Sequence, residues 1–417
     1  MTGDNLRKYP LAIVLTVSLF ALWGLTHRLY DTLIPPFAKV FALGSVELVL
    51  AQSVYSIVYF VFAIPAALYA RKFGYKAGLV FGLGSFCVGA FLFYPAAQQH
   101  VFVLFLLAAT VMSCGWIFLE VSANPLVAQL GSERNAAQRL NFAQAFYPVG
   151  VLVGVYAGRW LILSDLKLPV GQLAQAVVTP YIVIGAGALV LAFLVDKAKF
   201  PPIATEHIER GTGVRQEYRT LLSRPLFLFG VVAQFCYVAA QVGTWTMTAP
   251  YVENALPGIA ANAAANYLFW SLIIYGAGRF IGTALMSWID PDRLMAVFAA
   301  GAAVLAVTAA LAGGRLGVVA MVASSFFMSI LFPTILAVAI RGLGPLTKSG
   351  TALIYMGGAG GVAGLAVMHG IWTVSSITLA MLVPALCYAV VVVYALADRK
   401  AAALPGVSSS AARLICG

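Results

Sequence analysis

Charged residues are scarce in this 417-residue sequence, where Asp, Glu, Lys and Arg together make up 9% of the chain. A water-soluble domain carries roughly 25% of these residues. Apolar residues make up 62%, and the mean hydropathy is +0.95. Because so few charges cannot cover a core with a polar surface, most of the exterior must face lipid. The composition therefore excludes a soluble protein and makes the lipid bilayer the first expected partner.

Cysteine is also rare, and the spacing of cysteine and histidine indicates neither a metal site nor a catalytic site. The five cysteines show no CxxC spacing, and four of them fall inside apolar runs, where a thiol packs as a small hydrophobe. The four histidines are scattered along the chain. The glycine-rich run at 355–364 lacks the GK[ST] ending of a phosphate loop and predicts close helix packing. We expect no disulfide, no metal, no cofactor and no enzyme.

The net charge of +11 does not indicate a nucleic-acid partner, because the basic residues form no stripe. They sit in short groups between apolar runs. A membrane span needs ~20 mostly apolar residues, and this length rule predicts twelve transmembrane helices. The first run is too long for a cleavable signal peptide and is expected to be retained. The spans are expected at 10–38, 47–70, 76–97, 101–129, 140–164, 177–196, 225–252, 264–289, 293–312, 316–341, 349–371 and 375–397.

The basic groups also predict the orientation and the domains. They fall mainly on one side when the N-terminus is placed in the cytoplasm, so both termini are expected there. The longest polar stretch, 197–224, is interpreted as a cytoplasmic linker. We therefore expect an N-terminal six-helix half at 1–196, a C-terminal half at 225–398 and a cytoplasmic tail at 399–417. Weak likenesses between corresponding loops support two related halves.

Glu120 is the most informative ionisable residue, because it lies near the middle of the fourth predicted span. A charge buried at that depth costs several kcal/mol on insertion scales, which favours the neutral form and predicts ready uptake of a proton. Asn124 and Pro125 follow one turn later, and the proline can free a backbone carbonyl. The alternative is a protonated glutamic acid that only packs helices together.

Asp31 lies in the outer part of the first predicted span. His27 and Arg28 precede it by four and three residues, so the three side chains share a helix face. Arg28 can line the cavity and hold Asp31 ionised, or it can extend to lipid headgroups at the outer interface. The pattern leaves both interpretations open.

Amide side chains recur at helical spacing in the fifth and seventh spans. Asn141 and Gln144 share one face, and their amides suit the hydroxyls of a polar solute or hydrogen bonds between helices. Two arginines, Arg159 and Arg279, lie within or near spans, and Arg279 is expected to be structural. Aromatic rings are plentiful in the spans, where sugars can stack on them. A similar polar face is predicted for Gln234, Tyr237 and Gln241, with Asn266 on the eighth span.

Taken together, these stretches resemble the fucose–proton symporter family, a branch of the major facilitator superfamily that also includes glucose/galactose permeases. The likeness runs over nearly the whole chain and is carried by the residues 29–35, 120–125, 139–144, 234–241, 265–268, 327–330 and 333–335. The resemblance implies an all-α membrane fold of two six-helix halves, in the inner membrane of a bacterium. It also implies a sugar and protons as partners, a monomer, and a proton cycle that uses Asp31 and Glu120.

The sequence departs from the family pattern around the expected cavity. His27, Arg28 and Tyr30 stand where fucose permease carries asparagines, and Leu331 and Phe332 replace polar and tyrosine side chains. We therefore expect proton-coupled uptake of a monosaccharide, a fucose-like deoxyhexose or a hexose. The alternative is an uncoupled facilitator or an exporter of another polar or acidic sugar-like solute.

Overall fold

The computed structural model describes residues 9–41, 43–161, 170–206 and 213–402. Every regular element in these ranges is helical, which confirms the all-α prediction. Contacts between Cα atoms divide the chain into two compact units, the first of Met1–Ser132 with Phe146–Arg210 and the second of Glu133–Ala145 with Gly211–Gly417. The division differs from the predicted halves at one point, because residues 133–145 group with the second unit. The predicted domain boundaries otherwise stay a prediction.

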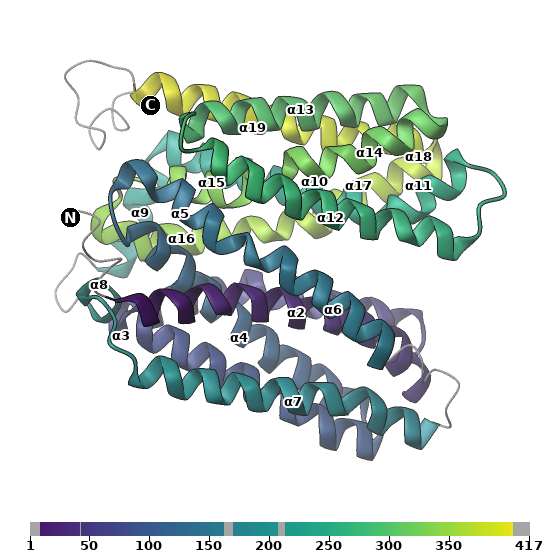
Figure 1. The fold of residues 1–417 in the computed structure, drawn as a ribbon, viewed down its shortest axis with the longest axis horizontal. Helices are drawn as coiled ribbons and strands as arrows, with labels where there is room; N and C mark the ends of the chain where they lie inside the picture. The colour runs from purple at the N-terminus through teal and green to yellow at the C-terminus, as the bar shows by residue number, and fades with distance from the viewer. Residues whose placement is uncertain (1–8, 42, 162–169, 207–212, 403–417) are drawn as a thin grey trace. The chain divides into compact units, whose positions relative to one another are not determined.

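The described part of the first unit contains the long helices α2, α3, α4, α6 and α7 and the short helix α8 (Figure 1). The helix α3 packs between α4 and α7, and α2 packs against α6. Their bounds are α2 Pro10–Val40, α3 Ser45–Gln99, α4 Phe102–Gln129, α6 Phe146–Leu161, α7 Val170–Lys197 and α8 Pro202–Thr205.

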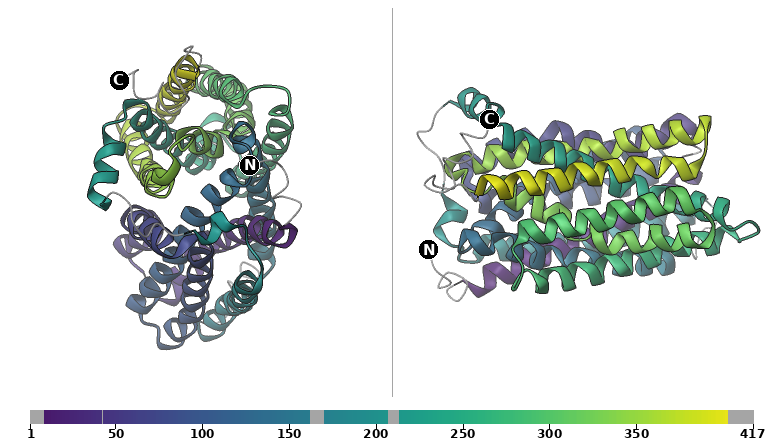
Figure 2. Two further views of the ribbon diagram at one scale, coloured as in Figure 1. Left: turned by 90° about the vertical axis from the view of Figure 1, so that its left-hand side faces the viewer. Right: turned by 90° about the horizontal axis from the view of Figure 1, so that it is seen from above.

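The second unit carries the remaining described helices, drawn from α5 in blue to α19 in yellow (Figure 2). Several of its predicted spans consist of shorter helices. The helix α10 packs on α17 and α19, α13 packs on α14 and α19, and α5 packs on α12 and α15. The bounds are η1 Glu133–Asn135, α5 Ala136–Gln144, α9 Val214–Leu222, α10 Pro225–Thr246, α11 Thr248–Ala255, α12 Ala261–Leu285, α13 Pro291–Ala312, α14 Gly314–Met328, α15 Leu331–Ala339, η3 Gly344–Leu346, α16 Thr347–Met356, η4 Gly357–Ala359, α17 Gly360–Val374, α18 Ile377–Ala380 and α19 Leu382–Ala402.

Eleven helices among the described residues are long and apolar enough to cross a membrane. One of them, Val54–Gln99, has 46 residues, and at about 1.5 Å per residue it is long enough to cross a bilayer twice. Gly74 interrupts it with φ 86° and ψ 165°, a conformation that glycine adopts readily. A Cβ there would also lie 2.8 Å from the carbonyl oxygen of Ala204 in α8. The two predicted spans therefore meet at Gly74, as the twelve-span prediction requires.

The helices α2 and α6 approach each other so closely that only glycine fits at the contact. A Cβ on Gly150 would overlap the carbonyl oxygen of Ala21, and one on Gly24 would overlap that of Tyr147. Small residues allow such approaches in membrane helix pairs, where packing and not water drives association. The pair brings Trp23 of α2 against Tyr147 at the start of α6, and it brings Arg28 against Gly154 further along that helix.

The described helices differ from the predicted spans in their breaks and in the linker. The predicted spans five, seven, ten and twelve each contain two helices, α5 with α6, α10 with α11, α14 with α15 and α18 with α19, and η4 interrupts span eleven. The predicted linker at 197–224 contains two helices, α8 and α9. In the second of these, Glu217 is 2% exposed and its Oε2 accepts a hydrogen bond from Ser349 Oγ at 2.7 Å. The polar composition of the linker therefore reflects a partly packed helix as well as a connection.

Candidate functional site

Glu120 occupies the interior of α4 and is 3% exposed. Its carboxyl accepts a hydrogen bond from the hydroxyl of Tyr59, which projects from α3. The backbone carbonyl of Glu120 accepts a hydrogen bond from Asn124 Nδ2 at 3.0 Å, so two predicted site residues are linked within one helix turn. The sequence alone showed no partner for Glu120 on its own helix. The structure supplies a neutral phenol from the neighbouring helix, and Tyr59 is a residue that the sequence analysis missed.

Aromatic rings from three helices gather one turn away from Glu120. His27 of α2 lies with its ring centroid 4.5 Å from that of Tyr55 and 5.3 Å from that of Trp116. Trp116 is fixed by a hydrogen bond from its Nε1 to Thr26 Oγ1 at 3.1 Å. A buried carboxyl beside several ring faces is the combination that polar and apolar surfaces of a sugar require. The pair of tyrosines at 55 and 59, four residues apart, was the available sequence signal.

The predicted partnership of Arg28 with Asp31 stays a prediction, because the side chain of Asp31 lies outside the described residues, as does that of Arg159. Arg28 itself is half-buried on α2. Its Cβ faces α6, since a Cβ built on Gly154 would lie 3.3 Å from it.

In the second unit, Gln144 contacts the fully buried Arg279 of α12. Arg279 is 1% exposed and donates from Nη1 to the side-chain oxygen of Gln144 at 3.1 Å and to its backbone oxygen at 3.2 Å. Nε donates to the backbone oxygen of Ser329 at 2.7 Å, and Nη2 donates to the hydroxyl of Tyr275. The guanidinium carbon also lies 4.8 Å from the centre of the Tyr275 ring. Arg279 thus links α12 to two backbone oxygens and to the side chain of a predicted site residue, Gln144.

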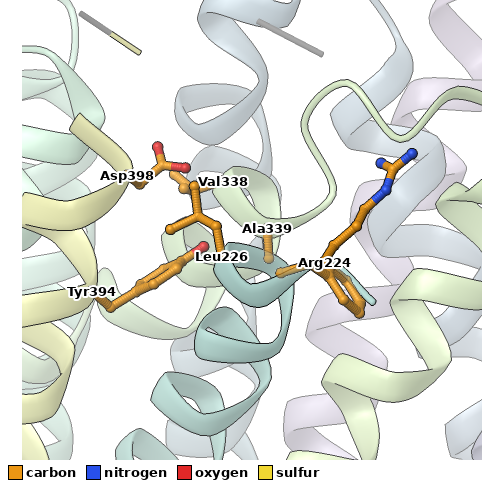
Figure 3. A pocket seen from close by; sticks show the side chains of 7 residues that line it. Arg224, Leu226, Val338, Ala339, Tyr394 and Asp398 are labelled. Carbon is orange, nitrogen blue, oxygen red and sulfur yellow. The ribbon is translucent and has the colours of Figure 1, made fainter. Parts of the chain in front are cut away.

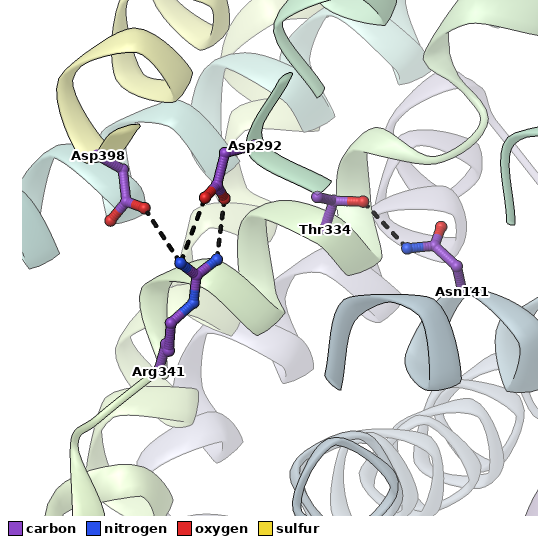
Figure 4. Close-up of polar contacts among 5 residues, drawn as sticks. All are labelled: Asn141, Asp292, Thr334, Arg341 and Asp398. Atoms are coloured by element: carbon purple, nitrogen blue, oxygen red, sulfur yellow. Dashed lines mark hydrogen bonds and ion pairs between the residues drawn. The ribbon is translucent and has the colours of Figure 1, made fainter. Parts of the chain in front are cut away.

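Asn141 lies one turn before Gln144 and is fully buried. Its Nδ2 donates to Thr334 Oγ1 at 3.0 Å (Figure 4). The same nitrogen donates to the backbone oxygen of Ala137 at 2.9 Å. Its Oδ1 has no hydrogen-bond partner among the described residues. Asn141 therefore serves as a link between helices and still offers an acceptor.

The predicted polar face of α10 is partly buried and partly open. Gln234 is 0% exposed, and neither amide atom has a hydrogen-bond partner in the described part of the chain. A Cβ built on Gly357 would lie 3.3 Å from the Cγ of Gln234, so the backbone of η4 passes beside this side chain. A Cβ built on the next residue, Gly358, would meet no atom within 4 Å. Tyr237 instead donates to the backbone oxygen of Met328 at 3.1 Å.

The remaining two predicted residues are less enclosed. Gln241 is half-buried on α10, and Asn266 is exposed on α12. Asn266 therefore does not join the buried amides, whereas Asn141, Gln144 and Gln234 are each enclosed within the second unit.

Two cavities of the second unit include none of the predicted site residues. One has a volume of about 20 Å³ and lies between Arg224, Tyr394 and Asp398 (Figure 3). The other, of about 410 Å³, is lined by charged side chains from several segments, among them Glu133, Arg134, Asp290, Asp292, Arg293, Arg341 and Arg399.

Arg341 is the centre of an ion-pair group at the larger cavity. It binds Asp292 through both terminal nitrogens, at 2.9 and 3.3 Å, and lies 3.7 Å from Asp398 Oδ2 (Figure 4). Burial tends to lower the pKa of Arg341, but the hydrogen bond and charges of the two aspartates outweigh it and raise the pKa above its ordinary value. The guanidinium is therefore permanently charged.

Comparison with known proteins places these features in context. The sequence matches the family model of the Major Facilitator Superfamily over residues 11–368. It is 36% identical to the L-fucose-proton symporter of Escherichia coli over 408 residues, which are 93% of each chain. It is 32% identical to the glucose/galactose transporter of Brucella abortus over 401 residues, 94% of this chain and 95% of that one. A crystal structure of the E. coli fucose:proton symporter superposes with a TM-score of 0.85 at 35% identity, covering 92% of this chain and 97% of that chain.

Proposed function

Because this chain belongs to the Major Facilitator Superfamily, in the branch of the fucose–proton symporters and glucose/galactose transporters, we propose that it carries a monosaccharide across the membrane together with a proton. Membership of this superfamily confirms the predicted fold and makes the chain a multi-pass membrane transporter and not an enzyme. The named relatives carry a 6-deoxyhexose or hexoses, so a sugar of that size is the proposed substrate.

The buried carboxyl of Glu120 is the observation that carries the proton part of the proposal. Glu120 is enclosed in α4, and the partner shown for its side chain is the neutral hydroxyl of Tyr59. Ionisable residues inside membrane spans commonly serve proton relays, and a buried carboxyl that accepts a hydrogen bond from a phenol fits that role. A proton symporter needs a group that binds a proton on one side of the membrane and releases it on the other. Asp31 is proposed as the second carboxyl of this cycle.

The amides of the second unit support the sugar part. Asn141 and Gln234 each retain buried polar atoms without a hydrogen-bond partner among the described residues, and such atoms carry a free-energy cost. A sugar hydroxyl can satisfy a carbonyl oxygen and an amide N–H at once. We assign substrate contacts to Asn141, Gln144 and Gln234 of the second unit. The role of His27 in the first unit stays a prediction.

Proteoliposomes test the proposal directly. Labelled fucose, glucose and galactose are supplied to vesicles with an inward proton gradient, with and without a protonophore. We expect gradient-driven accumulation of at least one sugar, which the protonophore abolishes. Glu120→Gln, which stays neutral, should lose accumulation while retaining exchange of labelled against unlabelled sugar. Accumulation by Glu120→Gln equal to that of the wild type would refute the role of Glu120.

The same assay separates the alternative function. A facilitator equilibrates sugar without accumulating it, and the protonophore then has no effect. A transporter of acidic sugars would prefer a hexuronate to a hexose, and Arg28→Ala would remove that preference. Either outcome would replace proton-coupled uptake of a neutral monosaccharide.

A further inference from the structure

Two of the predicted membrane spans, the fifth and the tenth, are interrupted four to five residues before a proline. The helix α5 ends at Gln144, and Pro148 stands four residues later. The helix α14 ends at Met328, Ser329 follows, and Pro333 stands four residues after Ser329. In a continuous helix each carbonyl accepts from the N–H four residues on, and proline has no N–H. The carbonyls of Gln144 and Ser329 are therefore the two that these prolines leave without a helical donor.

Arg279 donates to both of these carbonyls. Its Nε lies 2.7 Å from the Ser329 oxygen, and its Nη1 lies 3.2 Å from the Gln144 oxygen. An unsatisfied backbone carbonyl in a membrane span is costly, because no water can replace the lost donor. The planar guanidinium offers five N–H groups in a fixed fork, so one side chain can serve two acceptors on different helices.

The same contact fixes the orientation of the Gln144 amide. Arg279 has no acceptor, so the amide atom that faces Nη1 at 3.1 Å must be the oxygen. The nitrogen of the Gln144 side chain can only donate. The guanidinium thereby determines that Gln144 presents N–H groups to whatever group lies beyond it.

No carboxylate among the described residues forms an ion pair with Arg279, although it is 1% exposed. Its positive charge is stabilised by the oxygens of Ser329, Gln144 and Tyr275 and by the face of the Tyr275 ring. Burying a cation in this way is expensive unless each donor is used. The arrangement is therefore accounted for by the carbonyl acceptors and not by charge pairing.

We propose that Arg279 is a positioning residue of the transport site: it replaces the two helical hydrogen bonds that Pro148 and Pro333 remove, and it orients the Gln144 amide as a donor to an acceptor oxygen of the substrate. The second part rests on the proposed function, in which Gln144 binds the sugar. Through this contact the site selects for a hydroxyl or ring oxygen at that point of the sugar, and against a group that can only donate.

Stability of the purified protein tests the first part without any transport. Arg279→Gln should lower the apparent melting temperature, because the shorter amide cannot reach both carbonyls. Pro333→Ala restores a backbone N–H at position 333, which can donate to the carbonyl of Ser329. In the Arg279→Gln background it should therefore recover at least half of the lost melting temperature. Additive losses in the double variant would overturn the proposal. Arg279→Lys provides the same comparison if Arg279→Gln does not fold, and its single ammonium should not substitute for the fork.

Transport kinetics test the second part in the stabilised double variant. With the Gln144 amide no longer oriented, we expect KM for the sugar to rise by about five- to tenfold, the worth of one hydrogen bond, with kcat within about twofold of the wild type. Wild-type KM in this variant would leave Arg279 without a role in positioning. A wild-type KM in Gln144→Ala would instead refute the sugar contact of Gln144, and the stability result would stand independently.

Discussion

The hydroxyl of Tyr59 donates a hydrogen bond to the carboxyl of Glu120 across the contact between α3 and α4. A hydrogen bond to a charged group is worth about 1.5–3 kcal/mol, and this one favours the carboxylate. Tyr59→Phe keeps the ring, whose centroid lies 4.3 Å from that of Tyr55, and removes only the donor. We expect proton-driven accumulation to fall roughly tenfold, while sugar exchange without a gradient changes little.

A buried tyrosine of the second unit, whose hydroxyl bonds to a backbone oxygen of that unit, is the matched control for this variant. Tyr251 is 0% exposed, and its hydroxyl donates to the backbone oxygen of Ala309 at 2.5 Å. Tyr251→Phe also removes one buried hydroxyl, but it should leave the ratio of accumulation to exchange unchanged. An equal fall in both variants would mean that general destabilisation, and not the Glu120 contact, causes the effect.

Gln144→Glu is expected to stabilise the protein and at the same time to weaken its binding of the sugar. The new carboxylate would face the buried guanidinium of Arg279 at the place where the amide oxygen now lies 3.1 Å from Nη1. Opposite charges at that distance should raise the apparent melting temperature. A carboxylate has no N–H to donate, so KM for the sugar should rise by about tenfold. Gln241→Glu is the control, because it places the same charge on the half-buried face of α10 and should not stabilise the protein.

The spans were predictable because lipid imposes length and composition on every crossing segment. The breaks within the spans were not predictable, because both pieces of a broken helix are apolar and the apolar sequence continues through the break. Pro148 and Pro333 were the available signals, but whether proline kinks, ends or leaves a helix intact depends on what satisfies the freed carbonyl. In α4 the helix continues through Pro125. Arg279, which satisfies two such carbonyls, is distant in sequence from both.

The candidate site was predictable residue by residue but not as a set of contacts. Glu120, Asn141 and Gln144 were recognised because polar groups are rare in the spans. Their partners Tyr59 and Thr334 lie on other helices, and spacing along one helix says nothing about which faces of two helices meet. Asn266 matched the same polar pattern but is exposed on α12, so its part in the site stays a prediction.

Among the described residues, Arg341 is shared by two carboxylates, those of Asp292 and Asp398. Arg341 is 22% exposed and serves both Asp292 and Asp398, and the latter is 2% exposed. Removing the shared cation should cost about 1–3 kcal/mol, because two partly buried carboxylates then repel each other. We expect Arg341→Met to lower the apparent melting temperature and Asp398→Asn to restore part of it in the double variant. Asp398→Asn in the wild-type background should have the smaller effect of the two single substitutions, and the opposite order would contradict this account.

The predicted orientation places both termini in the cytoplasm, and two exposed positions of the second unit report on it. Asn262 lies in the first turn of α12 at the predicted outer end, and Ser287 follows α12 at the predicted inner end. A membrane-impermeant maleimide added to intact cells should label Asn262→Cys, and it should label Ser287→Cys only after the membrane is opened. Labelling above the wild-type background in the reverse order would invert the topology.

The contact between α2 and α6 predicts opposite effects for one substitution at two helical glycines. At Gly150 a Cβ would overlap the carbonyl oxygen of Ala21 and lie 2.9 Å from the nitrogen of Leu25, both backbone atoms that cannot move aside. Gly150→Ala must therefore push the two helices apart, at a cost of about 1–3 kcal/mol. At Gly84 in α3 a Cβ would meet nothing within 4 Å. Gly84→Ala should instead stabilise the protein by about 0.5–1 kcal/mol, because alanine loses less backbone freedom in a helix. Heating the purified proteins in detergent and measuring the fraction that stays folded compares the two. Because both changes add one methyl group to a helix of the same unit, equal melting temperatures would show that α2 and α6 do not meet as closely as described.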